Sequence, residues 1–181
     1  AKAVDGLHLA SKRLRYCSKP TVSAPFGMVL GGGAEVVMAT DAVCAHSLTW
    51  MGLVEIGAGL IPGGGGNLAL LTRYLENIPA NMNVDRFPYI QAVFEQVAMA
   101  KVSNTAEHAK EMKYLRLSDK IVPNRDDLIG AAKKMAIGMY EAGYEPKNPP
   151  NNLILPGRPG YATFEMGIYN MALGGFITEH E

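Results

Sequence analysis

Two glutamates stand out because each lies in a stretch that is otherwise apolar or rich in glycine. Glu35 follows three glycines in the segment VLGGGAEVVMA, and Glu55 is the one charged residue between Gly52 and Gly66. An ionised carboxylate is costly to bury unless a partner or a function compensates. Two carboxylates in one site can act as general acid and general base, so this pair predicts proton-transfer chemistry.

The glycine triplet Gly31–Gly33 lies where a short apolar run ends and a helical pattern begins. The first N–H groups of a helix have no acceptor within the helix, and the helix dipole makes its N-terminus electropositive. Glycine leaves that backbone open to a ligand, so the triplet could bind an oxygen that becomes negative during a reaction. The alternative is structural: the glycines allow close helix packing, and Glu35 complements the helix N-terminus.

Composition excludes several classes of function. The chain has 181 residues with 17 basic and 17 acidic side chains, so it has no positive surplus for nucleic acid. Neither GxxxxGK[ST] nor a well-formed GxGxxG occurs, which argues against a bound nucleotide cofactor. The four histidines and two cysteines show no metal-ligand spacing, and no apolar run is long enough to span a membrane.

The pattern of apolar residues predicts an α/β chain whose front half mixes strands and helices. We expect a helix over residues 3–16, strands over 21–24 and 42–46, and a helix between these strands after the glycines. Residues 47–66 read as irregular, and Asn67 is the expected N-cap of the following helix. Residues 76–89 read as a loop or insertion with no assigned function.

The back half is predicted to be mostly helical. Helices are expected over residues 89–101 and 126–143, and a third is expected to begin after an N-cap at Ser103 or Asn104. A short strand is expected at DKIVP. The predicted organisation is a core with its following helices over residues 1–144, a proline-rich linker over 145–160 and a C-terminal helix over 161–181.

Two segments resemble the crotonase superfamily of enoyl-CoA hydratases and isomerases. They are KPTVSAPFGMVLGGGAEVVMATDAVCAH and MGLVEIGAGLIPGGGGNLALL. The similarity continues through AMAKVSNTAEHAKEMKYLRLSDKIV and covers roughly residues 10–135. Two stretches look closest to the hydratase part of proteins that fuse a 3-hydroxyacyl-CoA dehydrogenase to a crotonase domain. These are MGLVEIGAGLIPGGGG and the tail GRPGYATFEMGIYNM. The resemblance implies a crotonase-like ββα spiral core.

This resemblance also implies roles for individual residues. Gly32 would donate its N–H to the thioester oxygen, while Glu35 and Glu55 would add water to a trans-2-enoyl-CoA in fatty-acid β-oxidation. Members with only the later acid tend to be isomerases, so both acids favour hydration. The residues expected around the substrate are Gly31, Gly33, Trp50, Met51, Pro62, Gly64 and Gly65, with core packing as the alternative for Trp50 and Met51.

Further expectations concern partners and completeness. Coenzyme A would enter as part of the acyl-CoA thioester substrate, no cofactor would bind this chain, and NAD would belong only to a longer parent protein. We expect a cytoplasmic homo-oligomer derived from the family's trimers, and no nucleic-acid partner. The family's second oxyanion donor and first core strands have no counterpart before Gly31, so the chain reads as an inactive fragment. Alternatives are a dehydrogenase parent and a non-catalytic CoA-ester-binding or oligomerisation module.

Overall fold

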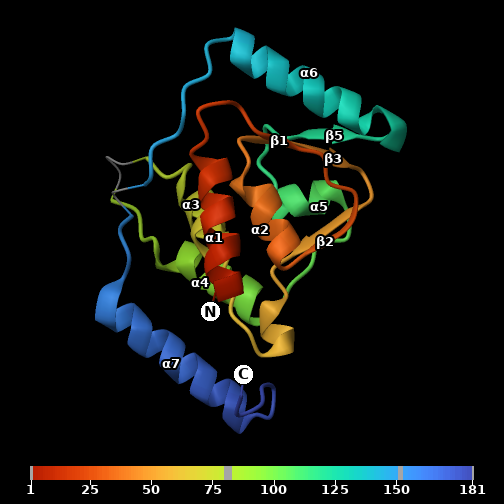
Figure 1. The fold of residues 1–181 in the computed structure, drawn as a ribbon. Helices are drawn as coiled ribbons and strands as arrows, with labels where there is room; N and C mark the ends of the chain where they lie inside the picture. The colour runs from red at the N-terminus through yellow and green to blue at the C-terminus, as the bar shows by residue number, and fades with distance from the viewer. Residues whose placement is uncertain (1, 80–82, 151–152, 181) are drawn as a thin grey trace.

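A computed structural model describes residues 2–79, 83–150 and 153–180 (Figure 1). Two small parallel sheets form its framework. One contains β1 (Val22–Ser23), β3 (Ala42–His46) and β5 (Lys120–Val122) in the order β1-β3-β5. The other pairs β2 (Gly27–Leu30) with β4 (Thr49–Gly52), so that Leu30 lies opposite Gly52. Because these parallel strands end at the same edge, the chain that follows each strand meets there.

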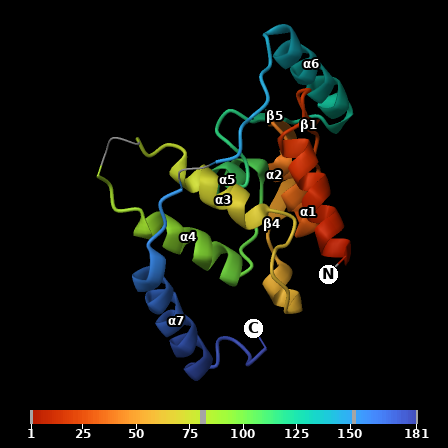
Figure 2. The same ribbon diagram turned by 60° about the vertical axis from the view of Figure 1, so that its left-hand side comes forward.

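Helices surround these sheets, and the first three in the chain lie side by side in both ribbon views (Figures 1 and 2). They are α1 (Lys2–Arg15), α2 (Gly32–Ala39) and α3 (Gly66–Leu75). A short 3₁₀ turn, η1 (Glu55–Ala58), links β4 to the glycine-rich approach to α3. The remaining elements are α4 (Phe87–Ala98), α5 (Ala106–Glu111), η2 (Arg125–Asp127), α6 (Leu128–Glu141) and α7 (Gly157–Leu173).

The hydrophobic core lies between α2, α3, α4, α5 and the strands β3 and β4. A second, smaller cluster lies under α6, where Leu128 and Ala132 pack against Cys44 and Val122. Helix α7 lies apart from the sheets and contacts α4 through aromatic rings (Figure 2). The ring of Phe164 stacks on those of Phe87 and Phe94, with centroids 5.4 and 4.6 Å away.

Most predicted helices and strands are present, but three local expectations are wrong. Residues 47–66 are not wholly irregular, because they contain β4, whose hydrogen-bond partner β2 lies more than twenty residues earlier in the chain. Gly65 rather than Asn67 caps α3, since its φ of 98° turns the chain into the helix. Thr105 caps α5, where its side chain accepts the N–H of His108 at 3.1 Å.

The predicted linker is shorter than expected because α7 already begins at Gly157. Within the regions assigned to the linker and to the 76–89 loop, residues 151–152 and 80–82 lie outside the described part of the chain. The division of the chain into core, linker and terminal helix stays a prediction.

Candidate active site

Glu35 lies in the first turn of α2 with only 1% of its surface exposed. Its carboxylate Oε2 accepts the N–H of Gly64 at 2.7 Å, and Oε1 accepts the N–H of Gly66 at 2.8 Å. These donors belong to the glycine-rich turn that opens α3, so the carboxylate occupies an electropositive helix N-terminus. Main-chain N–H groups therefore satisfy and orient a charge that would otherwise be costly to bury.

The glycines around Glu35 are required by space as well as by backbone conformation. A Cβ on Gly64 would lie 2.5 Å from Oε2 of Glu35, and one on Gly66 would lie 2.9 Å from its Oε1. Both distances are shorter than a non-bonded carbon–oxygen contact allows. The turn consequently accepts the carboxylate only because neither residue has a side chain.

Glu55 begins η1, directly after the end of β4. A Cβ on Gly31 would lie 3.4 Å from Oε1 of Glu55, which places this carboxylate beside the N-cap of α2. Its Oε2 is buried without a hydrogen-bond partner. Burial raises the pKa of Glu55 above its ordinary 4.5, and the nearby charge of Glu35 raises this pKa further. The two acids therefore interact, and Glu55 is the one disposed to retain a proton.

The N-terminus of α2 supplies the predicted backbone donors. Gly31 adopts a φ of 55° as N-cap, and its own N–H is used by the carbonyl of Gly52 at 2.8 Å. Gly32 and Gly33 form the first turn, where N–H groups have no acceptor within the helix. Beside them, a Cβ on Gly33 would meet no atom within 4 Å, so the surface there is open.

Helix α1 covers part of this site, a feature that the sequence did not predict. The side chain of Leu7 packs against both glycine segments, where a Cβ on Gly32 or on Gly64 would approach it to 3.2 or 3.0 Å. His8 Nδ1 lies 3.2 Å from the carbonyl oxygen of Gly63. The helical pattern indicates that Leu7 is partly buried, but only the three-dimensional fold places it against the glycines.

The other predicted substrate residues divide between two surfaces and the core. Met51 is fully buried in the core, whereas Trp50, its neighbour on β4, is 37% exposed. Neighbouring residues of a strand point to opposite faces, so one pocket surface cannot contain both side chains. Pro62 lines an apolar cavity, and Gly64 and Gly65 line a separate pocket beside α1.

The apolar cavity has a volume of about 420 Å³ and lies between η1, α3, α4 and α7. It begins at Ile56, the residue after Glu55, and extends past Pro62 and Leu68 to Phe94 and Phe164. Its lining is almost entirely aliphatic or aromatic, so it favours a hydrocarbon ligand over a polar one.

A tyrosine that the sequence analysis did not identify positions the chain leading to Glu55. The hydroxyl of Tyr114 accepts the N–H of Leu53 at 3.2 Å and donates to the carbonyl of Lys101 at 2.9 Å. Its side chain is fully buried, and burial raises its pKa. Nothing in its sequence context distinguishes this residue from an ordinary core tyrosine.

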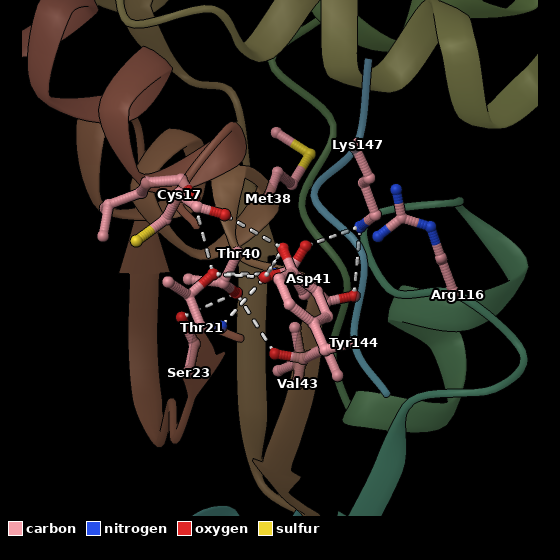
Figure 3. Close-up of polar contacts among 12 residues, drawn as sticks. Cys17, Thr21, Ser23, Met38, Thr40, Asp41, Val43, Arg116, Tyr144 and Lys147 are labelled. Atoms are coloured by element: carbon pink, nitrogen blue, oxygen red, sulfur yellow. Dashed lines mark hydrogen bonds and ion pairs between the residues drawn. The ribbon is translucent and has the colours of Figure 1, made fainter. Parts of the chain in front are cut away.

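Asp41, just after α2, anchors the opposite end of that helix (Figure 3). Its carboxylate accepts the N–H and hydroxyl of Thr21 at 2.8 and 2.9 Å and the hydroxyl of Tyr144 at 3.0 Å. Lys147 forms an ion pair with it at 3.2 Å. Burial alone would raise the pKa of Asp41, but the hydrogen bonds from Thr21 and the ammonium of Lys147 together lower it. Burial and the Asp41 charge raise the pKa of Tyr144 to about 12.

Comparisons with known proteins agree with this fold. The family model for enoyl-CoA hydratase/isomerase matches residues 5–83, which include both glutamates and the two glycine segments. The crystal structure of an enoyl-CoA hydratase from Bacillus anthracis superposes with a TM-score of 0.59 and 25% identity, over 77% of this chain and 46% of that one. Residues 5–83 thus belong to the enoyl-CoA hydratase/isomerase family, and the fold around them is crotonase-like.

Among curated relatives of this crotonase chain, a probable 3-hydroxyacyl-CoA dehydrogenase of Bacillus subtilis is 42% identical over 169 residues, which are 93% of this chain and 21% of that protein. A short-chain-enoyl-CoA hydratase of Clostridium acetobutylicum is 29% identical over 130 residues, covering 68% of this chain and 47% of that protein. The chain thus spans between a fifth and a half of the length of these two relatives.

Among the described residues there is neither a cluster of metal-ligating side chains nor a helix that could cross a membrane. Within residues 2–79, 83–150 and 153–180, no three histidine, cysteine, aspartate or glutamate side chains gather as a metal-ligand set. In the same residues, no helix combines the length and hydropathy needed to cross a membrane.

Proposed function

We propose that this chain carries the hydratase centre that adds water to the double bond of a 2-enoyl-CoA thioester. One observation carries the proposal: Glu35 is held by the second glycine segment, Glu55 lies beside Gly31 of the first, and the two acids are close enough that the charge of Glu35 raises the pKa of Glu55. Membership of residues 5–83 in the enoyl-CoA hydratase/isomerase family supports the same assignment.

In the proposed reaction, the N–H of Gly32 donates to the thioester oxygen, where negative charge develops as an enolate forms. Glu35 accepts a proton from water as the water oxygen bonds to C3. Glu55 gives its proton to C2 as the enolate collapses. The product is a 3-hydroxyacyl-CoA, and transfer of a proton from Glu35 to Glu55 through solvent restores the starting state.

The assignment of the two roles follows from their surroundings. Glu55 has a raised pKa and a buried oxygen without a partner, both of which favour a proton on that carboxyl. Glu35 has both oxygens held by backbone N–H groups, which fixes the direction from which a water can approach. We further propose that the hydrocarbon tail of the substrate lies in the cavity that begins at Ile56.

Gly32 supplies one donor to the oxyanion, whereas the family resemblance implies two. Removing one oxyanion donor typically lowers a rate by about 10²–10³-fold. We therefore expect this chain alone to hydrate its substrate at least about 10²-fold more slowly than hydratases with both donors. Its relation to the Bacillus subtilis protein also suggests that a longer parent oxidises the 3-hydroxyacyl-CoA product with NAD. NAD reduction by the full-length protein would test that second activity.

The decisive experiment uses the full-length protein and measures hydration of a 2-enoyl-CoA through loss of the ultraviolet absorbance of its conjugated thioester. Glu35→Gln and Glu55→Gln keep the side-chain shape but remove proton transfer, and each should abolish hydration while the circular dichroism stays unchanged. Glu111→Gln, at the exposed end of α5, is the matched control and should retain full activity. Turnover by the double variant at the wild-type rate would refute the assignment, and saturable binding without turnover would indicate a CoA-ester-binding module.

A further inference from the structure

The hydroxyl of Tyr114 joins two segments of the chain that are distant from each other in sequence. It accepts the N–H of Leu53, 61 residues earlier, at 3.2 Å and donates to the carbonyl of Lys101 at 2.9 Å. Leu53 directly follows β4, whereas Lys101 lies shortly after the end of α4. Neither Tyr114 nor Leu53 has any exposed surface. Because buried backbone groups need such partners, this hydroxyl fixes the point at which the chain leaves β4.

The backbone is strained at both ends of the hydrogen bond between Tyr114 and Lys101. Among the described residues, Ala100 and Lys113 are the non-glycine residues with a positive φ, of 48° and 60°. Each directly precedes one partner of this bond. A side chain in this backbone region has a steric cost, and such strain persists where the surrounding structure imposes it, often at functional sites. The fold therefore accepts two strained residues around a single buried hydroxyl.

Glu55 follows Leu53 by two residues and is oriented by the same stretch of backbone. Burial raises the pKa of its carboxyl most, while hydrogen bonds from the N–H groups of Glu55 itself and of Val54 lower this pKa. The N–H of Leu53 thus binds Tyr114, and the next two N–H groups bind the carboxylate. Burial also raises the pKa of Tyr114, and the nearby charge of Glu55 raises it further. A shift of the chain at Leu53 would therefore move the acid.

We propose that Tyr114 is a positioning residue whose hydroxyl holds Glu55 at the place from which it delivers its proton. This inference rests on the proposed function, because it concerns the acid that is named there. The hydroxyl acts through the main chain, since it is fully buried and binds backbone groups at Leu53 and Lys101. Its loss would let residues 53–55 move and let water reach the carboxyl, which would lower the pKa of Glu55 towards its ordinary value.

Tyr74 provides a matched control in the same core. Its hydroxyl donates to Oε1 of Gln96 at 2.9 Å, and burial raises its pKa as it raises that of Tyr114. This bond joins α3 to α4 and does not involve the chain that carries Glu55. Tyr74→Phe therefore removes a hydrogen-bonded phenol from the same hydrophobic cluster without releasing Leu53.

The test compares Tyr114→Phe with Tyr74→Phe in the full-length protein, by hydration of a 2-enoyl-CoA. Displacement of a reacting group by about 1 Å can lower a rate about 10²-fold, so kcat should fall about 10- to 100-fold in Tyr114→Phe. KM should stay within about twofold, because the hydroxyl does not contact the substrate. The pH at which kcat declines should also become lower, because the pKa of Glu55 falls. Tyr74→Phe should change none of these three quantities.

A second variant covers the case in which Tyr114→Phe alone does not fold. Lys113→Gly provides a stabilised background, because glycine adopts a φ of 60° without the steric cost of a side chain. The carbonyl at this position keeps its hydrogen bond from Arg73, which involves only the main chain of Lys113. Lys113→Gly alone should retain the wild-type kcat, and addition of Tyr114→Phe to it should reproduce the fall.

A measurement without substrate separates this inference from the hydratase assignment. The difference in urea midpoint between a protein and its Glu55→Gln counterpart, followed from pH 4 to pH 8, reports the proton affinity of Glu55. A lower pKa makes this difference smaller at neutral pH. It should therefore shrink in the Tyr114→Phe background and persist in the Tyr74→Phe background.

The outcomes distinguish the two assignments. If the wild type hydrates its substrate and Tyr114→Phe matches Tyr74→Phe in kcat, pH profile and midpoint difference, only the positioning role fails. Equal losses in both variants would reduce the effect to general destabilisation and would also overturn the inference. If no thioester is hydrated but the midpoint difference shrinks only with Tyr114→Phe, the hydratase assignment fails and the positioning of Glu55 by Tyr114 stands.

Discussion

The carboxylate of Glu35 on α2 accepts the main-chain N–H of Gly64 at 2.7 Å, across 29 residues of sequence. The second oxygen of Glu35 binds Gly66 in the same turn. Because Glu35 itself follows Gly31–Gly33 in the first turn of α2, these two bonds join the two glycine segments. The position of the acid therefore depends on the path of the backbone from η1 into α3.

Substitution of Gly64 tests this dependence. In Gly64→Ala the new methyl group would lie 2.5 Å from Oε2 of Glu35, so the carboxylate must move. A displacement of about 1 Å in a reacting group can lower a rate about 10²-fold, and overpacking costs about 1–3 kcal/mol of stability. Hydration assays and urea unfolding measure the two effects.

The control for that substitution is Gly138→Ala. A Cβ on Gly138 meets nothing within 4 Å, and this residue lies inside α6. Alanine is the better helix former, so this variant should be about 0.5–1 kcal/mol more stable and fully active. Equal activity in both variants would show that the turn does not position Glu35.

The raised pKa of Glu55 predicts a pH dependence with a definite sign. Between the ordinary value of 4.5 and its raised value, the folded chain binds more protons at this residue than the unfolded chain. The stability that this group contributes is complete below pH 4.5 and is lost as pH rises through the folded pKa. Glu55→Gln should therefore be more stable than the wild type at pH 7 and similar to it at pH 4.

Urea midpoints at several pH values measure this difference between the two proteins. Hydration should also fall as pH rises through the pKa of Glu55, because the proposed proton donor is then lost. A wild-type midpoint that increases between pH 4.5 and 7 relative to Glu55→Gln would contradict the prediction.

Asp41 predicts the opposite sign. Its pKa is lowered, so its contribution to stability is present above the ordinary 3.8 and is lost as pH falls through the folded value. Tyr144→Phe removes one hydrogen bond to this buried carboxylate and should cost about 1.5–3 kcal/mol near neutral pH. Thermal melts from pH 7 down through the folded pKa of Asp41 should show the cost shrinking as the carboxylate is protonated. A cost that stays the same after that protonation would mean that the hydroxyl of Tyr144 does not stabilise the fold through ionised Asp41.

The aromatic contact of α7 is testable through local stability. Phe164→Ala removes the ring that stacks on Phe87 and Phe94, a contribution of about 0.5–1.5 kcal/mol for each pair. Amide hydrogen exchange in Gly157–Leu173 should accelerate, while exchange in α2 stays unchanged. Phe176→Ala, whose ring is 77% exposed, should have no such effect. Exchange that Phe164→Ala leaves unaltered would show that other contacts hold α7.

The sequence predicted the elements that rest on local pattern. The amphipathic period of α1 and the apolar run of β3 are visible in their own residues, and both formed close to the expected bounds. Strand β4 was missed because Thr49–Gly52 is short and gains its hydrogen bonds from β2, which is distant in sequence.

The candidate site shows the same division. Glu35 and Glu55 were recognisable because isolated acids in apolar, glycine-rich segments are unusual. The packing of Leu7 over Gly32 was not recognisable. It depends on how α1 lies across α2, which no local spacing encodes (Figure 1).

The two hydrogen bonds that hold the carboxylate of Glu35 have a consequence for evolution. Both of its partners are peptide groups, and every amino acid except proline supplies that donor. A mutation can disturb the acid by adding bulk or by introducing proline, but it cannot delete a partner side chain. The placement of this carboxylate is inherited with the course of the main chain, and it can outlast wide divergence of the side chains around it.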